Sequence, residues 1–187
     1  MEAVRADIER YRTVAQVSTL RALFHSQGLH AMLVYRLGCV LERWWTLARL
    51  RLVLFWPLLP PALLVYALGI LLARKGYGIR LDLSAKIGPG LYIGHFGGIH
   101  ITHCTLGAHC SIAQQCKIGR SSEAAGPQIG NRVWIGAHAR VWGPITVADA
   151  STIGAGAHLN QNVAPRTLIM GNPARVMSSD YDNSKML

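Results

Sequence analysis

An aliphatic residue recurs every six positions over nearly half of the chain, and this period is the feature that most limits the possible fold. A period of six fits neither one face of an α-helix nor a simple β-hairpin. It fits a β-solenoid in which short strands meet at tight corners, with three hexads per triangular turn. The aliphatic side chains would then stack inside the solenoid about 4.8 Å apart. These positions are Leu81, Ile87, Ile93, Ile99, Leu106, Ile112, Ile118, Ile129, Ile135, Val141, Val147, Ile153 and Leu159.

The period is interrupted twice. One extra residue lies between Ile99 and Leu106, and a longer insertion separates Ile118 from Ile129. The thirteen hexads predict roughly four turns, more than the about three repeats that a solenoid needs for stability. We expect substrate contacts at the loop 119–128, because it is where the repeat stops.

Residues 1–77 have a different pattern, which predicts an α-helical, apolar N-terminal region. Residues 29–41 carry a leucine-rich stripe with helical spacing. The segment 52–72 contains no charged residue, but it contains Pro57, Pro60 and Pro61, which oppose a single membrane-spanning helix. Cations lie on both sides of it, so the charge bias that orients a span is missing. We expect a peripheral or re-entrant membrane contact; the alternative is a buried helical pair at an oligomer interface.

The net charge of +10 is concentrated in the N-terminal part of the chain. Residues 1–80 contain 11 Lys/Arg and 4 Asp/Glu, a difference of +7, and residues 81–187 contain 8 and 5, a difference of +3. A basic, apolar region suits an anionic membrane surface. Nucleic acid is not expected, because no recognised binding motif accompanies the charge. The four cysteines form no C-x-x-C pair, so we expect no metal site.

The hexads resemble the serine-acetyltransferase-like branch of the hexapeptide-repeat acyltransferases, over residues 78–176. The resemblance is carried by "IGPGLYIGHFGGIHI", "IGNRVWIGAHARVWGPITV" and the closing "VAPRTLIMGNPARV", which occur in that order. It implies a mainly β fold, a left-handed parallel β-helix, assembled as a homotrimer with acetyl-CoA as co-substrate. Residues 177–187 would form a polar C-terminal tail.

The same resemblance assigns the general base to His95, in "GHFGG". A hydroxyl attacks a thioester poorly until a base takes its proton, and histidine has an ordinary pKa suited to that task. Relatives place an aspartate six residues before the lysine of "AKIG"; Arg80 stands there in this chain. Asp82 is the nearest carboxylate and would orient His95, unless a backbone carbonyl does so. Asp82 would also contact His100 in the next turn.

Cofactor contacts follow from the resemblance as well. The pantetheine arm would lie along the solenoid between subunits, against the backbone of Gly-Ala positions, and a cation would meet the cofactor phosphates. His138 is a possible neighbour of the cofactor or the substrate. The matching positions are Gly136, Ala137, Gly154, Ala155 and Arg175.

The loop departs from the family pattern at the acceptor. Serine acetyltransferases carry an Arg-His pair before the loop proline, whereas Ala125 and Gly126 precede Pro127 here. The chain also matches polysaccharide-biosynthesis members through "IGHFGG" and "GNRVWIGA". We therefore expect an O-acetyltransferase that modifies a sugar or lipid-linked sugar hydroxyl during surface-polysaccharide assembly, on the cytoplasmic side of the inner membrane. The alternative is serine O-acetylation for cysteine biosynthesis.

Overall fold

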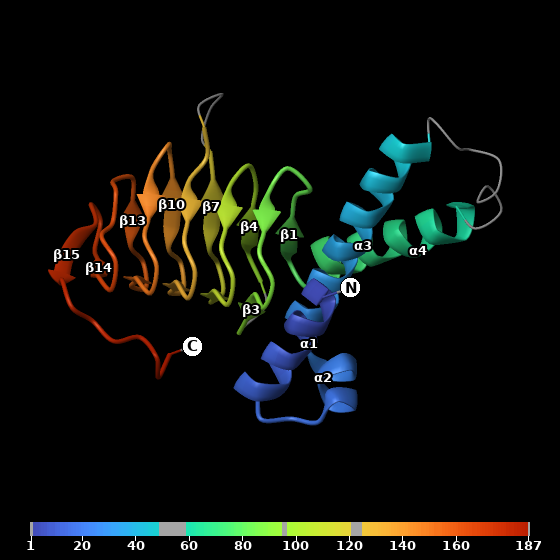
Figure 1. Ribbon diagram of the computed structural model, residues 1–187, viewed down its shortest axis with the longest axis horizontal. Coiled ribbons are helices and arrows are strands. Elements are labelled where there is room, and N and C mark those ends of the chain that lie inside the picture. The colour runs from blue at the N-terminus through green and yellow to red at the C-terminus, as the bar shows by residue number, and fades with distance from the viewer. Residues whose placement is uncertain (1, 49–58, 95–96, 121–124, 187) are drawn as a thin grey trace.

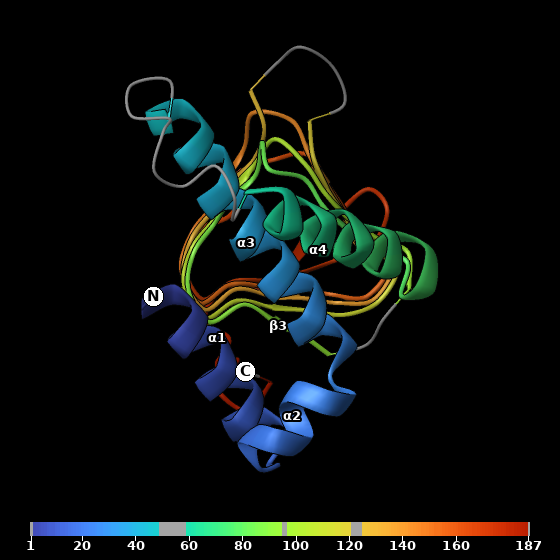
Figure 2. The same ribbon diagram turned by 90° about the vertical axis from the view of Figure 1, so that its right-hand side faces the viewer.

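Three parallel β-sheets form the sides of a triangular prism, and the α-helices of the described N-terminal residues gather at one end of it (Figures 1 and 2). The structure is a computed structural model that describes residues 2–48, 59–94, 97–120 and 125–186. Viewed along its axis, the solenoid has a triangular outline (Figure 2). The predicted fold class is confirmed: the chain forms a left-handed parallel β-helix of about four turns, preceded by a helical region.

Up to β13, each turn contributes one strand to each sheet, so strands three apart in sequence are neighbours; in the last turn an isolated bridge between Val147 and Val163 replaces the sheet B strand, and β14 pairs with β12. Sheet A consists of β1 (Ile79–Leu81), β4 (Ile99–Ile101), β7 (Lys117–Gly119), β10 (Arg140–Trp142) and β13 (His158–Leu159). Sheet B consists of β2 (Lys86–Ile87), β5 (Thr105–Leu106), β8 (Gln128–Ile129) and β11 (Thr146–Val147). Sheet C consists of β3 (Tyr92–Ile93), β6 (Ser111–Ile112), β9 (Trp134–Ile135), β12 (Thr152–Ile153), β14 (Leu168–Met170) and the antiparallel β15 (Arg175–Ser178).

The aliphatic ladders fill the prism, but the first turn has a different register from the one that the period predicts. Leu81 pairs with Ile101 and Ile79 pairs with Ile99, so eight positions instead of six separate Ile93 from its successor in the ladder. Ile99 and Ile101 are both fully buried. Because they share strand parity, the aliphatic pattern alone cannot distinguish them.

This shift of two residues changes one predicted contact. His100 pairs with Arg80 on one side and with Lys117 on the other. The predicted contact between Asp82 and His100 is therefore wrong.

The N-terminal helices cover the open first turn of the solenoid. They are α1 (Glu2–Val14), α2 (Thr19–His25), α3 (Gln27–Ala48) and α4 (Leu59–Leu71), followed by a π-helical turn η2 (Leu72–Gly76). Met32 and Tyr35 of α3 join the core cluster of the solenoid, and α3 contacts β1 and β3. In Figure 2 these helices lie across the end of the prism.

Polar side chains from the helices satisfy the backbone groups that the first turn would otherwise leave without partners. Asp7 is fully buried and accepts hydrogen bonds from the Gly90 N–H (2.7 Å) and from Arg36 Nε (2.9 Å). Arg36 also donates to the carbonyls of Ile87 (2.7 Å) and Gly88 (2.6 Å). Tyr11 Oη accepts from the Ile93 N–H at 2.9 Å. The helices thus protect the edges of strands that would otherwise be free to pair with another chain.

The segment 52–72 is described only from Leu59 onward. Pro60 and Pro61 lie in the first turn of α4, where proline breaks no helical hydrogen bond. Pro57, the third proline expected to oppose a single spanning helix, lies outside the described residues. At the other end of the chain, the segment after β15 returns along the solenoid (Figure 1), and the buried Asn183 donates to the carbonyls of Arg132 (2.9 Å) and Ser151 (3.2 Å).

Candidate active site

One edge of the prism brings together most of the residues that the sequence singles out. We call it the C–A edge: the corners that join each strand of sheet C to the next strand of sheet A. Its successive turns are the segments 94–98, 113–116, 136–139 and 154–157. The segment 94–98 includes His95, which lies outside the described residues.

Small residues form a continuous row along this edge. Each donates its N–H to the sheet C strand of the next turn: Gly94 to Ile112 (3.0 Å), Ala113 to Ile135 (2.9 Å), Gly136 to Ile153 (2.8 Å) and Gly154 to Ile169 (2.7 Å). The row therefore presents mainly backbone and carries no long side chain between Gly94 and Gly154.

Glycine is required at Gly136, and open space adjoins two other glycines of the edge. A Cβ atom at Gly136 would lie 2.5 Å from the Ala155 nitrogen, too close for any side chain. Gly97 (φ 99°) and Gly156 (φ 67°) face free space, with no atom within 4 Å of an added Cβ. The C–A edge thus combines a flat backbone track with room beside it for an extended ligand.

The structure brings four of the five predicted cofactor residues together on this edge, and the fifth, Arg175, lies on β15 beyond its end. Gly136 and Ala137 stack on Gly154 and Ala155, and the Gly156 N–H donates to the Ala137 carbonyl at 2.7 Å. Met170 follows Gly154 in the row and pairs with Arg175 of β15, an exposed cation at the end of the same track. The row thus leads from the segment that contains His95 toward a positive charge.

His138 also lies on the C–A edge. It is exposed, has a φ of 61°, and donates its N–H to the Gln114 carbonyl at 3.0 Å. His138 belongs to the solenoid turn that lies between the turn of Gln115 and the turn of Gly156, beside the row of small residues.

Asp82 lies at a different corner, between β1 and β2. Its carboxylate accepts hydrogen bonds from the Ser84 N–H (3.0 Å) and hydroxyl (2.8 Å), and Arg80 Nη2 is 3.9 Å away. The Ser84 hydrogen bonds, with smaller contributions from Arg80 and His103, hold the pKa of Asp82 below its ordinary value. Gly78, which contacts Gly97 and Gly98, lies at the opposite end of β1.

Asp82 is therefore one strand length away from the backbone that flanks His95. Its described neighbours are Ser84, Arg80 and His103. The orientation of His95 by Asp82 stays a prediction.

The contact between the Asp82–Ser84 corner and His103 was not predicted from the sequence. The Ser84 hydroxyl accepts from the His103 N–H at 3.1 Å, which ties two successive turns together. His103 is exposed and has a φ of 39°. The hexad period predicts that residues 18 positions apart stack in successive turns. This rule does not bring His103 next to Asp82 or Ser84, because the shifted first turn changes the offset.

The loop 119–128 begins and ends beside these residues. A Cβ at Gly126 would collide with the His103 carbonyl oxygen, and Gly119 (φ 149°) packs against the backbone of Thr102. The Thr105 N–H donates to the Pro127 carbonyl at 3.0 Å. Residues 121–124 of the loop lie outside the described residues, so the substrate contacts predicted there stay a prediction.

Cysteines occupy three buried corners of one turn: Cys104, Cys110 and Cys116. Burial raises the pKa of each thiol, to about 12 for Cys104 and about 11 for Cys110 and Cys116. Among the described residues, no group of three or more His, Cys, Asp or Glu side chains is placed to hold a metal ion.

Comparison with known proteins gives matches to hexapeptide-repeat transferases. Residues 126–161 match the model of the bacterial transferase hexapeptide (six repeats). Over 159 residues, the chain is 33% identical to a serine acetyltransferase of Helicobacter pylori strain 26695, covering 82% of each protein. It is 30% identical to the mitochondrial serine acetyltransferase 3 of Arabidopsis thaliana, covering 99% of the chain but only 44% of that relative.

A solved structure of the same kind shares the fold. The serine acetyltransferase of Brucella abortus strain S19 in complex with coenzyme A superposes with a TM-score of 0.76 at 20% identity, covering 96% of this chain and 68% of that one.

These matches correct the predicted acceptor. The curated relatives are named serine acetyltransferases, so the prediction of a sugar hydroxyl in polysaccharide assembly is wrong. The segments "IGHFGG" and "GNRVWIGA", on which that prediction relied, extend from β3 into the C–A edge and from the end of β8 through β9. Such segments define the scaffold of the solenoid, and a shared scaffold does not determine the acceptor.

Proposed function

The chain belongs to the serine acetyltransferase family of hexapeptide-repeat transferases, and from this we propose that it is an acetyl-CoA-dependent serine O-acetyltransferase. The family relationship supports the acceptor and the acyl donor. The Brucella relative binds coenzyme A on the same fold, which supports the use of acetyl-CoA. The alternative that the sequence left open is thus the function that we propose.

The reaction would be a direct acyl transfer. The serine hydroxyl oxygen attacks the thioester carbonyl carbon while His95 takes the hydroxyl proton. The tetrahedral oxyanion then collapses, the carbon–sulfur bond breaks, and the proton passes to the departing thiolate. The products are O-acetylserine and coenzyme A. A positioned base of this kind contributes about 10²–10⁴-fold to the rate.

The row of small residues on the C–A edge is the observation that carries the proposal. It starts at Gly94, next to His95 in sequence, and passes Gly136 and Gly154 toward Arg175. An extended pantetheine arm along this row would place its thioester at the His95 end and its phosphates toward the cation. We assign the cofactor role to Gly136, Ala137, Gly154, Ala155 and Arg175 on this basis.

The assembly that we propose is a homotrimer, with residues 78–176 as its catalytic solenoid. The family relationship supports this assembly. The arm would then lie between two protomers, which would exclude water from the thioester.

Steady-state kinetics with acetyl-CoA and L-serine tests this function, with release of the coenzyme A thiol as the measured signal. The wild-type protein should form O-acetylserine, identified by mass spectrometry. His95→Asn should lower kcat by about 10²-fold or more, because no other group would take the hydroxyl proton.

The matched control is His109→Asn. His109 is exposed, lies at a corner between sheets B and C and has a φ of 57°, a conformation that asparagine tolerates. This variant should retain the wild-type rate. Serine-independent turnover, or a His95→Asn enzyme with an unchanged kcat, would contradict the proposal.

A further inference from the structure

Helix α4 is apolar on all sides, yet only one side of it is covered. Over Leu59–Gly76 the mean hydropathy is 1.3, and only 6% of this stretch is buried. By length and composition it is the one candidate for a membrane span in the part of the chain that the structure describes. A helix that is apolar all round normally lies in a protein core or in lipid.

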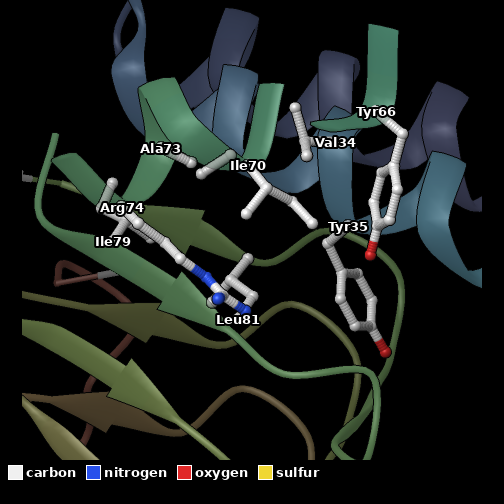
Figure 3. Close-up of a pocket in the computed structure, with 9 residues that line it drawn as sticks. Val34, Tyr35, Tyr66, Ile70, Ala73, Arg74, Ile79 and Leu81 are labelled. Atoms are coloured by element: carbon white, nitrogen blue, oxygen red, sulfur yellow. The ribbon is translucent and has the colours of Figure 1, made fainter. Parts of the chain in front are cut away.

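The covered side of α4 is well defined. Tyr66 lies against Gly38 of α3 and Gly69 lies against Val34, so closely that a Cβ on either glycine would collide. In Figure 3, Tyr66 and Ile70 line a small pocket with Tyr35 of α3, at the junction with β1. These contacts fasten α4 to the folded protein along its length, so it does not cross a bilayer as a separate helix.

The opposite side of α4 is a leucine surface with no described cover. Leu64, Leu68 and Leu71 lie four and three residues apart on one helix face, and their exposed fractions are 61%, 57% and 56%. Leu63, Val65 and Leu72 extend this surface and are 44%, 61% and 50% exposed. Exposed apolar surface of this extent on a single helix indicates a partner.

The charge of the sequence segment that contains this surface indicates which partner it is. From residue 43 to residue 81 the sequence contains no acidic residue but six cations: Arg43, Arg49, Arg51, Arg74, Lys75 and Arg80. Arg74 and Lys75 are exposed in η2, the turn that follows α4; Arg74 extends toward Leu81 across the small pocket (Figure 3), which leaves Lys75 as the cation next to the leucine surface. A second copy of this chain would bring two sets of these cations together without a carboxylate from either segment, whereas anionic phospholipid would neutralise them.

We propose that the leucine surface of α4 docks on an anionic lipid bilayer. The helix lies in the plane of the membrane, its leucines enter the acyl region, and Lys75 at the end of the helix meets the phosphate groups. The protein is thus held at a membrane surface while α3 and the solenoid stay on the aqueous side. This proposal is independent of the reaction that we propose for the C–A edge.

Vesicle flotation of the full chain tests the docking. Wild-type protein should float with vesicles of phosphatidylcholine and phosphatidylglycerol, and much less with phosphatidylcholine alone. Each cation near the surface contributes about fivefold to binding, so raising the salt concentration should release the protein. A wild-type protein that does not float with the anionic vesicles would overturn the proposal, whatever the result with the variants.

The variant Leu64→Asp with Leu68→Asp should bind the anionic vesicles at least about tenfold more weakly, because two leucines can no longer enter the lipid. The matched control is Leu20→Asp with Phe24→Asp in α2, at 69% and 76% exposure, which should bind like wild type. Circular dichroism should show unchanged helix content in both variants. Equal loss of binding in both variants, or none in the α4 variant, would refute the docking.

Light scattering without lipid addresses a second copy as the occupant. The α4 variant and the wild type should have the same oligomeric mass. A lower mass for the α4 variant would show that another protomer covers the leucines, and would overturn the proposal.

Discussion

Single side chains from the helices determine how the first turn of the solenoid ends. Tyr11 is buried, and its hydroxyl oxygen accepts from the Ile93 N–H at 2.9 Å. On its other side, β3 is bonded to the next turn: the Tyr92 N–H reaches Cys110 and the Gly94 N–H reaches Ile112. Tyr11 therefore supplies the partner for a backbone donor that faces away from the sheet, two residues before His95.

Tyr11→Phe tests this arrangement. The variant keeps the ring but leaves the buried Ile93 N–H without an acceptor, so unfolding in urea should show a loss of about 1–3 kcal/mol. Tyr181→Phe is the control, because the Tyr181 hydroxyl makes an exposed contact with a methionine sulfur, and its stability should stay within about 0.5 kcal/mol of wild type. An equal effect of the two substitutions would show that Tyr11 acts only through its ring.

At the scale of an element, sheet A carries an unusual outward row. Its paired strands align Arg80, His100, Lys117, Arg140 and His158, one cation or histidine per turn. Like charges directly opposite each other on adjacent strands destabilise a sheet. Partial burial, followed by the charges of Lys117 and Arg80, lowers the pKa of His100 from the ordinary value of 6.5.

The lowered pKa of His100 sets the direction of a pH effect. Between the folded pKa and 6.5, the unfolded chain binds more protons than the folded one. The contribution of His100 to stability is therefore complete above pH 6.5 and is lost as the pH falls below it. Urea midpoints measured across this range should decrease toward acid, and added salt should reduce the decrease by screening the row.

Lys117→Gln should raise the pKa of His100, as measured by NMR titration. It should also stabilise the protein by about 0.2–1 kcal/mol at neutral pH. Lys86→Gln is the matched control, since Lys86 is also an exposed strand lysine but pairs with Thr105. It should change neither quantity. An unchanged His100 pKa in Lys117→Gln would show that burial alone causes the shift.

At the scale of the whole molecule, the solenoid could be predicted from the sequence because the hexad period recurs in every turn. Inward aliphatic residues at hexad spacing follow directly from the strand and corner geometry. The register of the first turn could not be predicted, because Ile99 and Ile101 are both aliphatic and point the same way. Because of that ambiguity, the sequence paired His100 with the wrong residue of the first turn. For the same reason it did not predict that His103 lies near Asp82.

The candidate site was predictable in part for the same reason. One solenoid turn separates Gly136 from Gly154 and Ala137 from Ala155, so the stacking of each pair follows from the period. The period does not predict that Arg175 lies near this row, because β15 turns back against β14 after the hexads end; only the family resemblance singled out Arg175. The acceptor was mispredicted because the matched segments report on the scaffold, which many acceptors can share.

Calorimetric titration with coenzyme A of two matched variants tests most directly whether the C–A edge is the cofactor track. Ala155 and Ala164 are both exposed alanines at corners of the prism, but Ala155 lies on the C–A edge and Ala164 lies between sheets B and C. Ala155→Trp should weaken coenzyme A binding at least about tenfold by filling the track, while Ala164→Trp binds like wild type. Normal binding by Ala155→Trp, or equal loss in both variants, would contradict the account.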